Sequence, residues 1–180
     1  MVWSEADFER LPEEGLWEVV DGRAILLPPN DVEHQFISDA LGRMLWPQLE
    51  RHKCGFAVST PNVFIPRKKD ALGRFQNRVP DVAVFKRQPK RHFEVGNPPE
   101  LVIEILATRR GNVERTEKMD DYALAGIAEY WIVNPFDKVV EMYSLRGGEY
   151  VSKGSASTGV ISPDDFPGVR IDVPSLWVAY

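Results

Sequence analysis

An apolar run at residues 101–107, LVIEILA, contains a single ionisable residue, Glu104. Such a run is typical of a strand that is buried on both faces of a sheet. In extended geometry Val102, Glu104 and Leu106 share one face, so the carboxylate emerges among apolar neighbours. An ionised carboxylate is costly to bury there and requires a cation, a proton or several hydrogen-bond donors as compensation. The run therefore predicts a strand buried on both faces, with a cation, a proton or hydrogen-bond donors next to the Glu104 carboxylate.

A second carboxylate, Asp81, follows Pro80 at the head of the apolar run VPDVAVF. Proline suits the first position of a strand because it cannot donate to the strand ladder. A Mg²⁺ ion shared by Asp81 and Glu104 would compensate both groups, since Mg²⁺ is commonly held by one or two carboxylates, waters and substrate phosphate. Two alternatives stay open: Asp81 as a plain strand-start or turn residue, and Glu104 in a buried salt bridge with Arg109 or Arg110.

Periodicity and turn signals predict an α/β order along the chain. Asp21-Gly22 lies between two apolar runs and predicts a hairpin over 17–27. Helical spacing of apolar residues predicts a helix over 32–49 that Asn30 or Asp31 caps. The other predicted elements are strands at 55–65, from Pro80, and at 101–106, 129–133, 139–145 and 149–151, a helix over 112–125 that ends at Gly126, and a loop that includes Ser155, Ser157, Thr158 and Gly159. We expect a mixed central sheet with the first helix on one face and the later helix on the other.

Composition excludes several classes of protein. With 180 residues, 43% hydrophobic and 27% charged, the chain suits one soluble globular domain. The start MVWSEADFERLPEEG lacks the features of a secretory signal, and no segment has the length of a membrane helix, so we expect a cytoplasmic protein without membrane contact. Cys54 is the only cysteine, which excludes an internal disulfide, and with His52 alone it is too few for a zinc site. We expect no organic cofactor.

Charge is distributed unevenly along the chain. The net charge is −5, yet residues 67–92 hold nine Lys or Arg against two Asp, a local charge of +7. This segment brackets Asp81 and could hold phosphates near a metal, because phosphate contacts supply most sequence-independent affinity for nucleic acid. The alternative is a solvated basic loop.

Six segments together resemble one known family. They are WEVVDGRAILLPP, EHQFISDAL, VPDVAVF, PPELVIEIL, EKMDDYALAGIAEYWIVNP and FPGVRIDVPSLW, in this order over nearly all 180 residues. The chain is similar to the Uma-type restriction endonuclease family within the PD-(D/E)XK nuclease superfamily. The resemblance implies one restriction endonuclease-like α/β domain over 1–180, with a mixed central sheet flanked by helices.

The resemblance also implies roles for particular residues. The aspartate of the Pro-Asp pair and the glutamate of the next strand bind metal in the superfamily, which here are Asp81 and Glu104, joined by the backbone carbonyl of Ile105. The usual lysine position holds Leu106, and in this family its role passes to a lysine on the following helix, here Lys118, ahead of Tyr122. A surface ion pair between Glu114 and Lys118 is the alternative.

Two other positions match the family pattern. His34 would be a secondary acid, base or phosphate contact, or else a packed histidine at a helix start. Glu18 would be a further acidic group of the site or the partner of an internal cation. Trp17, Tyr130 and Trp131 lie in strand patterns and are expected in the core.

These observations predict a Mg²⁺-dependent DNA endonuclease, with Mn²⁺ as a substitute. One departure opens an alternative: where relatives have Ser-Pro-Ser, this chain has Ala107-Thr108-Arg109. Arg109 and Arg110 would either grip a phosphate or pair with the carboxylates and displace the metal. The second outcome would make the protein a degraded nuclease that serves as a nucleic-acid-binding or protein-interaction module. A homodimer is compatible with both functions.

Overall fold

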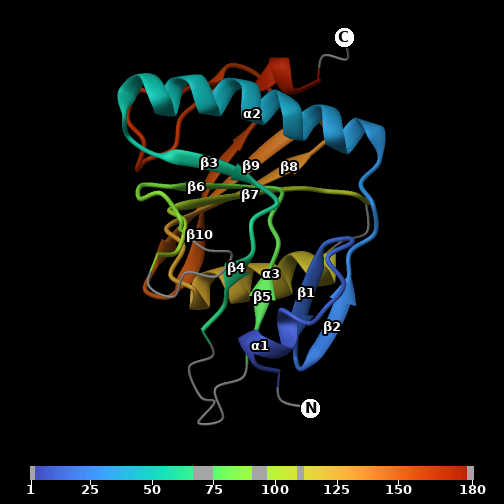
Figure 1. The fold of residues 1–180 in the computed structure, drawn as a ribbon. Coiled ribbons are helices and arrows are strands. Elements are labelled where there is room, and N and C mark those ends of the chain that lie inside the picture. Colours follow the sequence, from blue (N-terminus) through green and yellow to red (C-terminus); the bar gives the residue numbers. More distant parts are fainter. Residues whose placement is uncertain (1–2, 67–74, 91–96, 109–111, 178–180) are drawn as a thin grey trace.

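Two β-sheets meet beside helix α3 in the computed structural model, which describes residues 3–66, 75–90, 97–108 and 112–177 (Figure 1). The larger sheet has six strands in the order β10-β9-β8-β7-β6-β3. Its strands are β3 (Phe56–Ser59), β6 (Val82–Phe85), β7 (Leu101–Ile105), β8 (Glu129–Asn134), β9 (Val139–Arg146) and β10 (Glu149–Ala156). Strands β7 and β8 run parallel and the other neighbours antiparallel, which confirms the predicted mixed sheet.

The smaller sheet has four strands in the order β2-β1-β5-β4. It consists of β1 (Trp17–Val20), β2 (Arg23–Leu26), β4 (Val63–Phe64) and β5 (Asn77–Arg78). Strands β1 and β2 form the predicted hairpin, and its turn residues Asp21 and Gly22 have φ of 50° and 75°. The remaining elements are α1 (Glu5–Phe8), the paired strands β11 (Val160–Ile161) and β12 (Ile171–Asp172), and the 3₁₀ helix η1 (Val173–Trp177).

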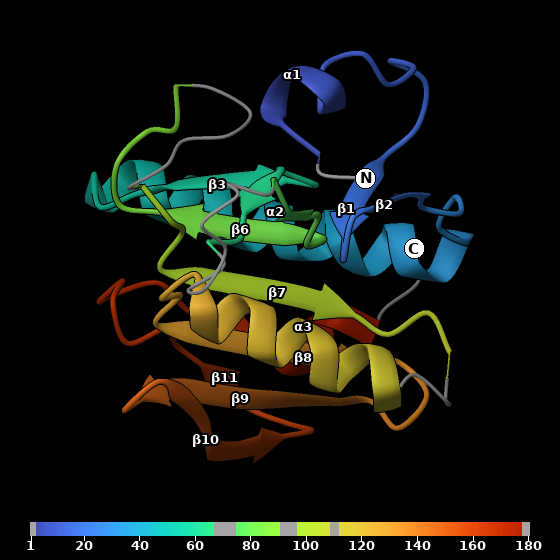
Figure 2. The ribbon, with the colours of Figure 1, turned by 90° about the horizontal axis from the view of Figure 1, so that it is seen from below.

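The two long helices cover opposite faces of the larger sheet, as predicted. Helix α2 (Val32–His52) lies on one face and α3 (Asn112–Leu124) on the other, where Figures 1 and 2 show it beside β7 and β8. Asp31 caps α2 by accepting a hydrogen bond of 2.8 Å from the N–H of His34. Gly126 follows α3 with φ of 75°, as a left-handed C-terminal cap requires. Among the described residues, no helix combines the length and hydropathy needed to cross a membrane.

Alternation along the central strands places apolar side chains in one cluster on each face of the larger sheet. In β7, Leu101, Ile103 and Ile105 pack on the α2 side, whereas Val102 packs on the α3 side. Glu104 therefore shares the α3 face with Val102. In β8 the same alternation buries Trp131 toward α2 and Tyr130 toward α3, which confirms both as core residues. Trp17 is only half-buried, contrary to expectation: it begins β1 of the smaller sheet, and its indole N–H donates to the carbonyl of Pro12 over 3.2 Å at the surface.

Two strand predictions needed correction. The segment 55–65 forms two strands in different sheets, because Thr60 has a φ of 47° and turns the chain before Pro61. Strand β10 continues through Ser155, which was predicted in a loop. β10 pairs with β9 as far as Ala156 and Val140. The long strand β9 thus supplies hydrogen-bond partners for the backbone of β10, although β10 is a largely polar edge strand.

Candidate active site

The two carboxylates of the sequence prediction lie opposite each other on neighbouring strands. Val82 pairs with Ile103, so Asp81, one residue earlier, faces Glu104, one residue later. Cross-strand neighbours point to the same face, here the α3 side, and lie within reach of a shared ligand. Both are buried, with exposed fractions of 9% for Asp81 and 6% for Glu104. They line one cavity of about 150 Å³.

Asp81 has one polar contact at each oxygen. The N–H of Ile105 donates to Oδ2 over 2.7 Å, and Nε2 of His34 lies 3.1 Å from Oδ1. Extending the register places Pro80 opposite Ile105. Pro80 has no N–H, so it cannot donate to the Ile105 carbonyl. The strand-start proline therefore gives the Ile105 carbonyl no ladder hydrogen bond from the opposite residue.

His34 comes from the first turn of α2 and is buried. Burial opposes protonation of its imidazole, but the hydrogen bond to Asp81 and the charges of Asp81, Asp31 and Glu104 outweigh it, so the pKa of His34 is raised. Within the described residues Nδ1 has no hydrogen-bond partner. His34 therefore contacts Asp81 through an imidazole whose protonated form is favoured, and it also lines the cavity.

Glu104 contacts two residues one turn apart on α3. Nζ of Lys118 donates to Oε2 over 2.9 Å, and the hydroxyl of Tyr122 donates to Oε1 over 2.5 Å. Burial raises the pKa of Glu104 to about 7, the charge of Asp81 adds to the rise, and Lys118 and Tyr122 oppose it. Burial also raises the pKa of Tyr122 well above its ordinary value, so its hydroxyl remains a donor. The Lys118 ammonium and the Tyr122 hydroxyl thus compensate the Glu104 carboxylate for its burial.

Asp81 and Glu104 could supply part of the coordination shell of a hard divalent cation. Asp81 and Glu104 supply carboxylate oxygens, which Mg²⁺ prefers, and each oxygen can accept more than one partner. In the described ranges no group of three or more His, Cys, Asp or Glu side chains has metal-binding geometry. The protein thus offers a partial shell, which is the usual arrangement where waters and a substrate phosphate complete the coordination of Mg²⁺.

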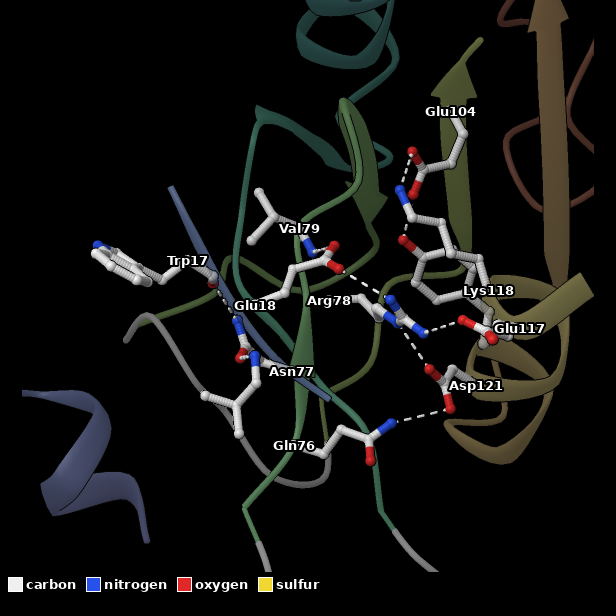
Figure 3. Close-up of polar contacts among 12 residues, drawn as sticks. Trp17, Glu18, Gln76, Asn77, Arg78, Val79, Glu104, Glu117, Lys118 and Asp121 are labelled. Atoms are coloured by element: carbon white, nitrogen blue, oxygen red, sulfur yellow. Dashed lines mark hydrogen bonds and ion pairs between the residues drawn. The ribbon is translucent and has the colours of Figure 1, made fainter. Parts of the chain in front are cut away.

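A buried ion network lies beside this cavity (Figure 3). Arg78 of β5 donates from Nη1 to Oε2 of Glu18 over 2.9 Å and from Nε to Oδ2 of Asp121 over 2.7 Å. The other oxygen of Glu18 accepts the N–H of Val79 over 2.9 Å. Glu18 is thus the partner of an internal cation, one of the two roles predicted for it. Arg78 is 4% exposed, so counting it with a basic loop that contacts phosphate was wrong.

The structure brings together most of the predicted site residues. His34, Asp81, Glu104, Ile105 and Lys118 all line the same cavity. Arg109, Arg110, the side chain of Glu114 and part of the basic segment, residues 67–74 and 91–92, lie outside the described residues. The blocking role of the arginines and the Glu114–Lys118 pair therefore stay predictions.

Sequence reasoning missed two contributions to the site. Tyr122 was noted only as a marker for Lys118, although its hydroxyl contacts Glu104. The signal was available, because residues four apart on a helix share a face. Arg78 was counted with the basic segment 67–92, which was expected to contact phosphate or to face solvent, and no local pattern distinguishes a buried arginine from an exposed one.

Comparison with known proteins identifies the family and the fold. A family profile described as "Putative restriction endonuclease" (Uma2) matches residues 5–174. Among solved structures, a putative nuclease belonging to DUF820 from Anabaena variabilis ATCC 29413 is similar, with a TM-score of 0.75, 18% sequence identity and coverage of 96% of each chain. A search of curated proteins gave no match. The fold is thus the restriction endonuclease-like α/β fold, and the chain belongs to the Uma2 family of putative restriction endonucleases.

Proposed function

We propose that this protein is a Mg²⁺-dependent endonuclease that hydrolyses phosphodiester bonds in DNA. The observation that carries the proposal is the convergence of two opposed carboxylates, a lysine and a histidine on one cavity. Family membership supports nuclease activity, and the cavity supplies the residues to which each chemical role is assigned.

Asp81 and Glu104, with the carbonyl of Ile105, are the proposed metal ligands. A bound Mg²⁺ or Mn²⁺ supplies polarisation of the phosphate and a lower pKa for a coordinated water. The described hydrogen bonds orient the ligands beforehand: Ile105 and His34 hold Asp81, and Lys118 and Tyr122 hold Glu104. Preorganised ligands of this kind lower the reorganisation required when substrate binds.

Lys118 is the proposed partner of the attacking water. Its ammonium lies at the cavity wall against Glu104, where it can donate a hydrogen bond to the water and stabilise negative charge that develops on the phosphate. His34 lies against Asp81 at the same cavity. We assign it a secondary role, as a proton donor from Nε2 or as a phosphate contact.

Cleavage of labelled DNA tests the proposal directly. Purified protein is incubated with single- and double-stranded DNA in Mg²⁺, Mn²⁺ or EDTA, next to Asp81→Asn. Asparagine keeps one oxygen that can accept the Ile105 N–H and removes the charge, so the fold should survive while metal-dependent cleavage is lost.

The other outcomes are equally informative. Retained cleavage by Asp81→Asn would exclude the metal site proposed here. Absence of cleavage by the wild type in every condition would instead support the degraded nuclease that serves as a binding module.

A further inference from the structure

Helix α3 contacts both sheets through two adjacent stripes of residues. Lys118 and Tyr122 contact Glu104 of the larger sheet. Their immediate predecessors, Glu117 and Asp121, contact Arg78 of the smaller sheet, with Nη2 of Arg78 4.0 Å from Glu117 and Nε 2.7 Å from Asp121. Each stripe consists of residues four apart, which lie on one helix face. The same two turns of α3 are therefore held from two directions (Figure 3).

The same guanidinium also connects to the segment that leads into Asp81. Glu18 accepts from Arg78 at one oxygen and from the N–H of Val79 at the other, both over 2.9 Å. Val79 precedes Asp81 by two residues and lines the active-site cavity. Arg78 and Glu18 thus link the helix that carries Lys118 to the start of the strand that carries Asp81.

The energetics of burial favour a geometric role for this network. A buried ion pair is weak evidence for stability, because desolvation of both charges offsets their attraction. Arginine differs from lysine in its rigid planar fork, which can address two carboxylates at once in fixed directions. Here Nε contacts Asp121 on α3 and Nη1 contacts Glu18 on β1. Although burial opposes its charge, the two carboxylates outweigh that effect and raise the pKa of Arg78, so the cation is permanent.

We propose that Arg78 is a positioning residue, which sets the Lys118 ammonium against Glu104 and at a fixed place relative to Asp81. Its catalytic meaning rests on the proposed nuclease function, whereas its geometric effect does not. The matched control is Lys153, which pairs with the buried Glu129 over 2.7 Å. The indole N–H of Trp131 donates to Glu129 over 3.0 Å, and both residues lie on the α2 face of the larger sheet. Glu104 lies on the opposite face.

The first experiment is an NMR measurement on the metal-free protein. The Lys118 ammonium signal is assigned by its loss in Lys118→Arg and is then recorded in Arg78→Lys, which keeps the charge but loses the fork. We expect this signal to shift or to broaden through faster exchange with water, because α3 is no longer held at Glu117 and Asp121. Lys153→Gln should leave the signal in place. An unchanged Lys118 signal in folded Arg78→Lys would overturn the proposal.

A milder variant covers the case in which Arg78→Lys does not fold. Asp121→Asn keeps an oxygen that can accept from Nε of Arg78 while removing the charge. The Lys118 signal should then shift in the same direction by a smaller amount. No shift in the folded Asp121→Asn protein would contradict the proposal.

The second experiment measures single-turnover cleavage together with Mn²⁺ binding. A displacement of a catalytic group by about 1 Å can reduce a rate by roughly 10²-fold. We expect a loss of this order for Arg78→Lys with a much smaller change in the Kd for Mn²⁺. Arg78→Lys should cause no further loss when it is added to Lys118→Met, because the group that it positions is then absent. Additive losses would show that Arg78 acts elsewhere.

The two experiments separate this inference from the proposed function. If the wild type cleaves no DNA, the nuclease proposal fails while the NMR measurement still decides whether Arg78 positions Lys118. If the wild type cleaves DNA and Arg78→Lys cleaves equally well, the nuclease proposal stands and the positioning role is excluded.

Discussion

At the scale of single residues, two lysines pair with buried glutamates, but only one of the two pairs lines the active-site cavity. Lys118 contacts Glu104 at the wall of the cavity, whereas Lys153 contacts Glu129 and Asp164. We predict that Lys118→Met lowers the single-turnover cleavage rate by about 10²-fold or more, the usual scale of a lost proton-transfer or water-orienting group. The Kd for Mn²⁺, measured by calorimetry, should change much less, because the substitution removes no oxygen ligand.

Lys153→Met is the matched control for this prediction. It deprives a buried carboxylate of its cation in the same way, so it should lower the melting temperature while leaving the cleavage rate of the folded protein close to that of the wild type. A loss of Mn²⁺ affinity as large as the loss of rate in Lys118→Met would show that Lys118 supports the ligands rather than the water.

At the scale of elements, two glycines should respond to alanine with opposite signs. Gly126 ends α3 with φ of 75° and has open space around it, so its substitution costs only backbone strain, about 1 kcal/mol. Gly42 lies inside α2, where an added Cβ would meet Trp46 at 4.0 Å, an ordinary contact. Gly42→Ala should therefore raise the free energy of unfolding by roughly 0.5–1 kcal/mol. Urea unfolding of both variants checks the pair, and equal signs would contradict these backbone conformations.

At the scale of the whole molecule, the cavity depends on elements that are far apart in the sequence. α2 contributes His34, the strand starts and ends contribute Asp81 and Glu104, and α3 contributes Lys118. A ligand that binds only this assembled site stabilises the entire fold. We predict that Mg²⁺ at about 100 times its Kd adds roughly 2.7 kcal/mol, or about 5–10 °C in melting temperature. Thermal unfolding with and without Mg²⁺ measures this shift, and Asp81→Asn should abolish it; an equal shift in that variant would place the ion elsewhere.

Local patterns were sufficient to predict most elements of this fold. Asp21-Gly22 identified the hairpin, the pair Asn30 and Asp31 the start of α2, and Gly126 the end of α3, because turn and cap chemistry depends on a few neighbouring residues. Asp81 and Glu104 could also be identified in the sequence, as ionisable residues in apolar runs. That they lie opposite each other follows from the pairing of β6 with β7, which the sequence does not show. The family resemblance, borne by many segments in order, added Lys118 and His34 to the same candidate site.

Side-chain period and turn preference were thus enough to predict most of the elements and the acidic pair. The ion pairs, in contrast, follow from how the elements pack in the folded chain. Arg78 belongs to a basic stretch along the chain, yet it lies between Glu18 and Asp121, 60 and 43 residues away. Tyr122 reaches Glu104 across 18 residues. Burial and ion pairing depend on which elements meet in space, a relation that no local window of sequence contains.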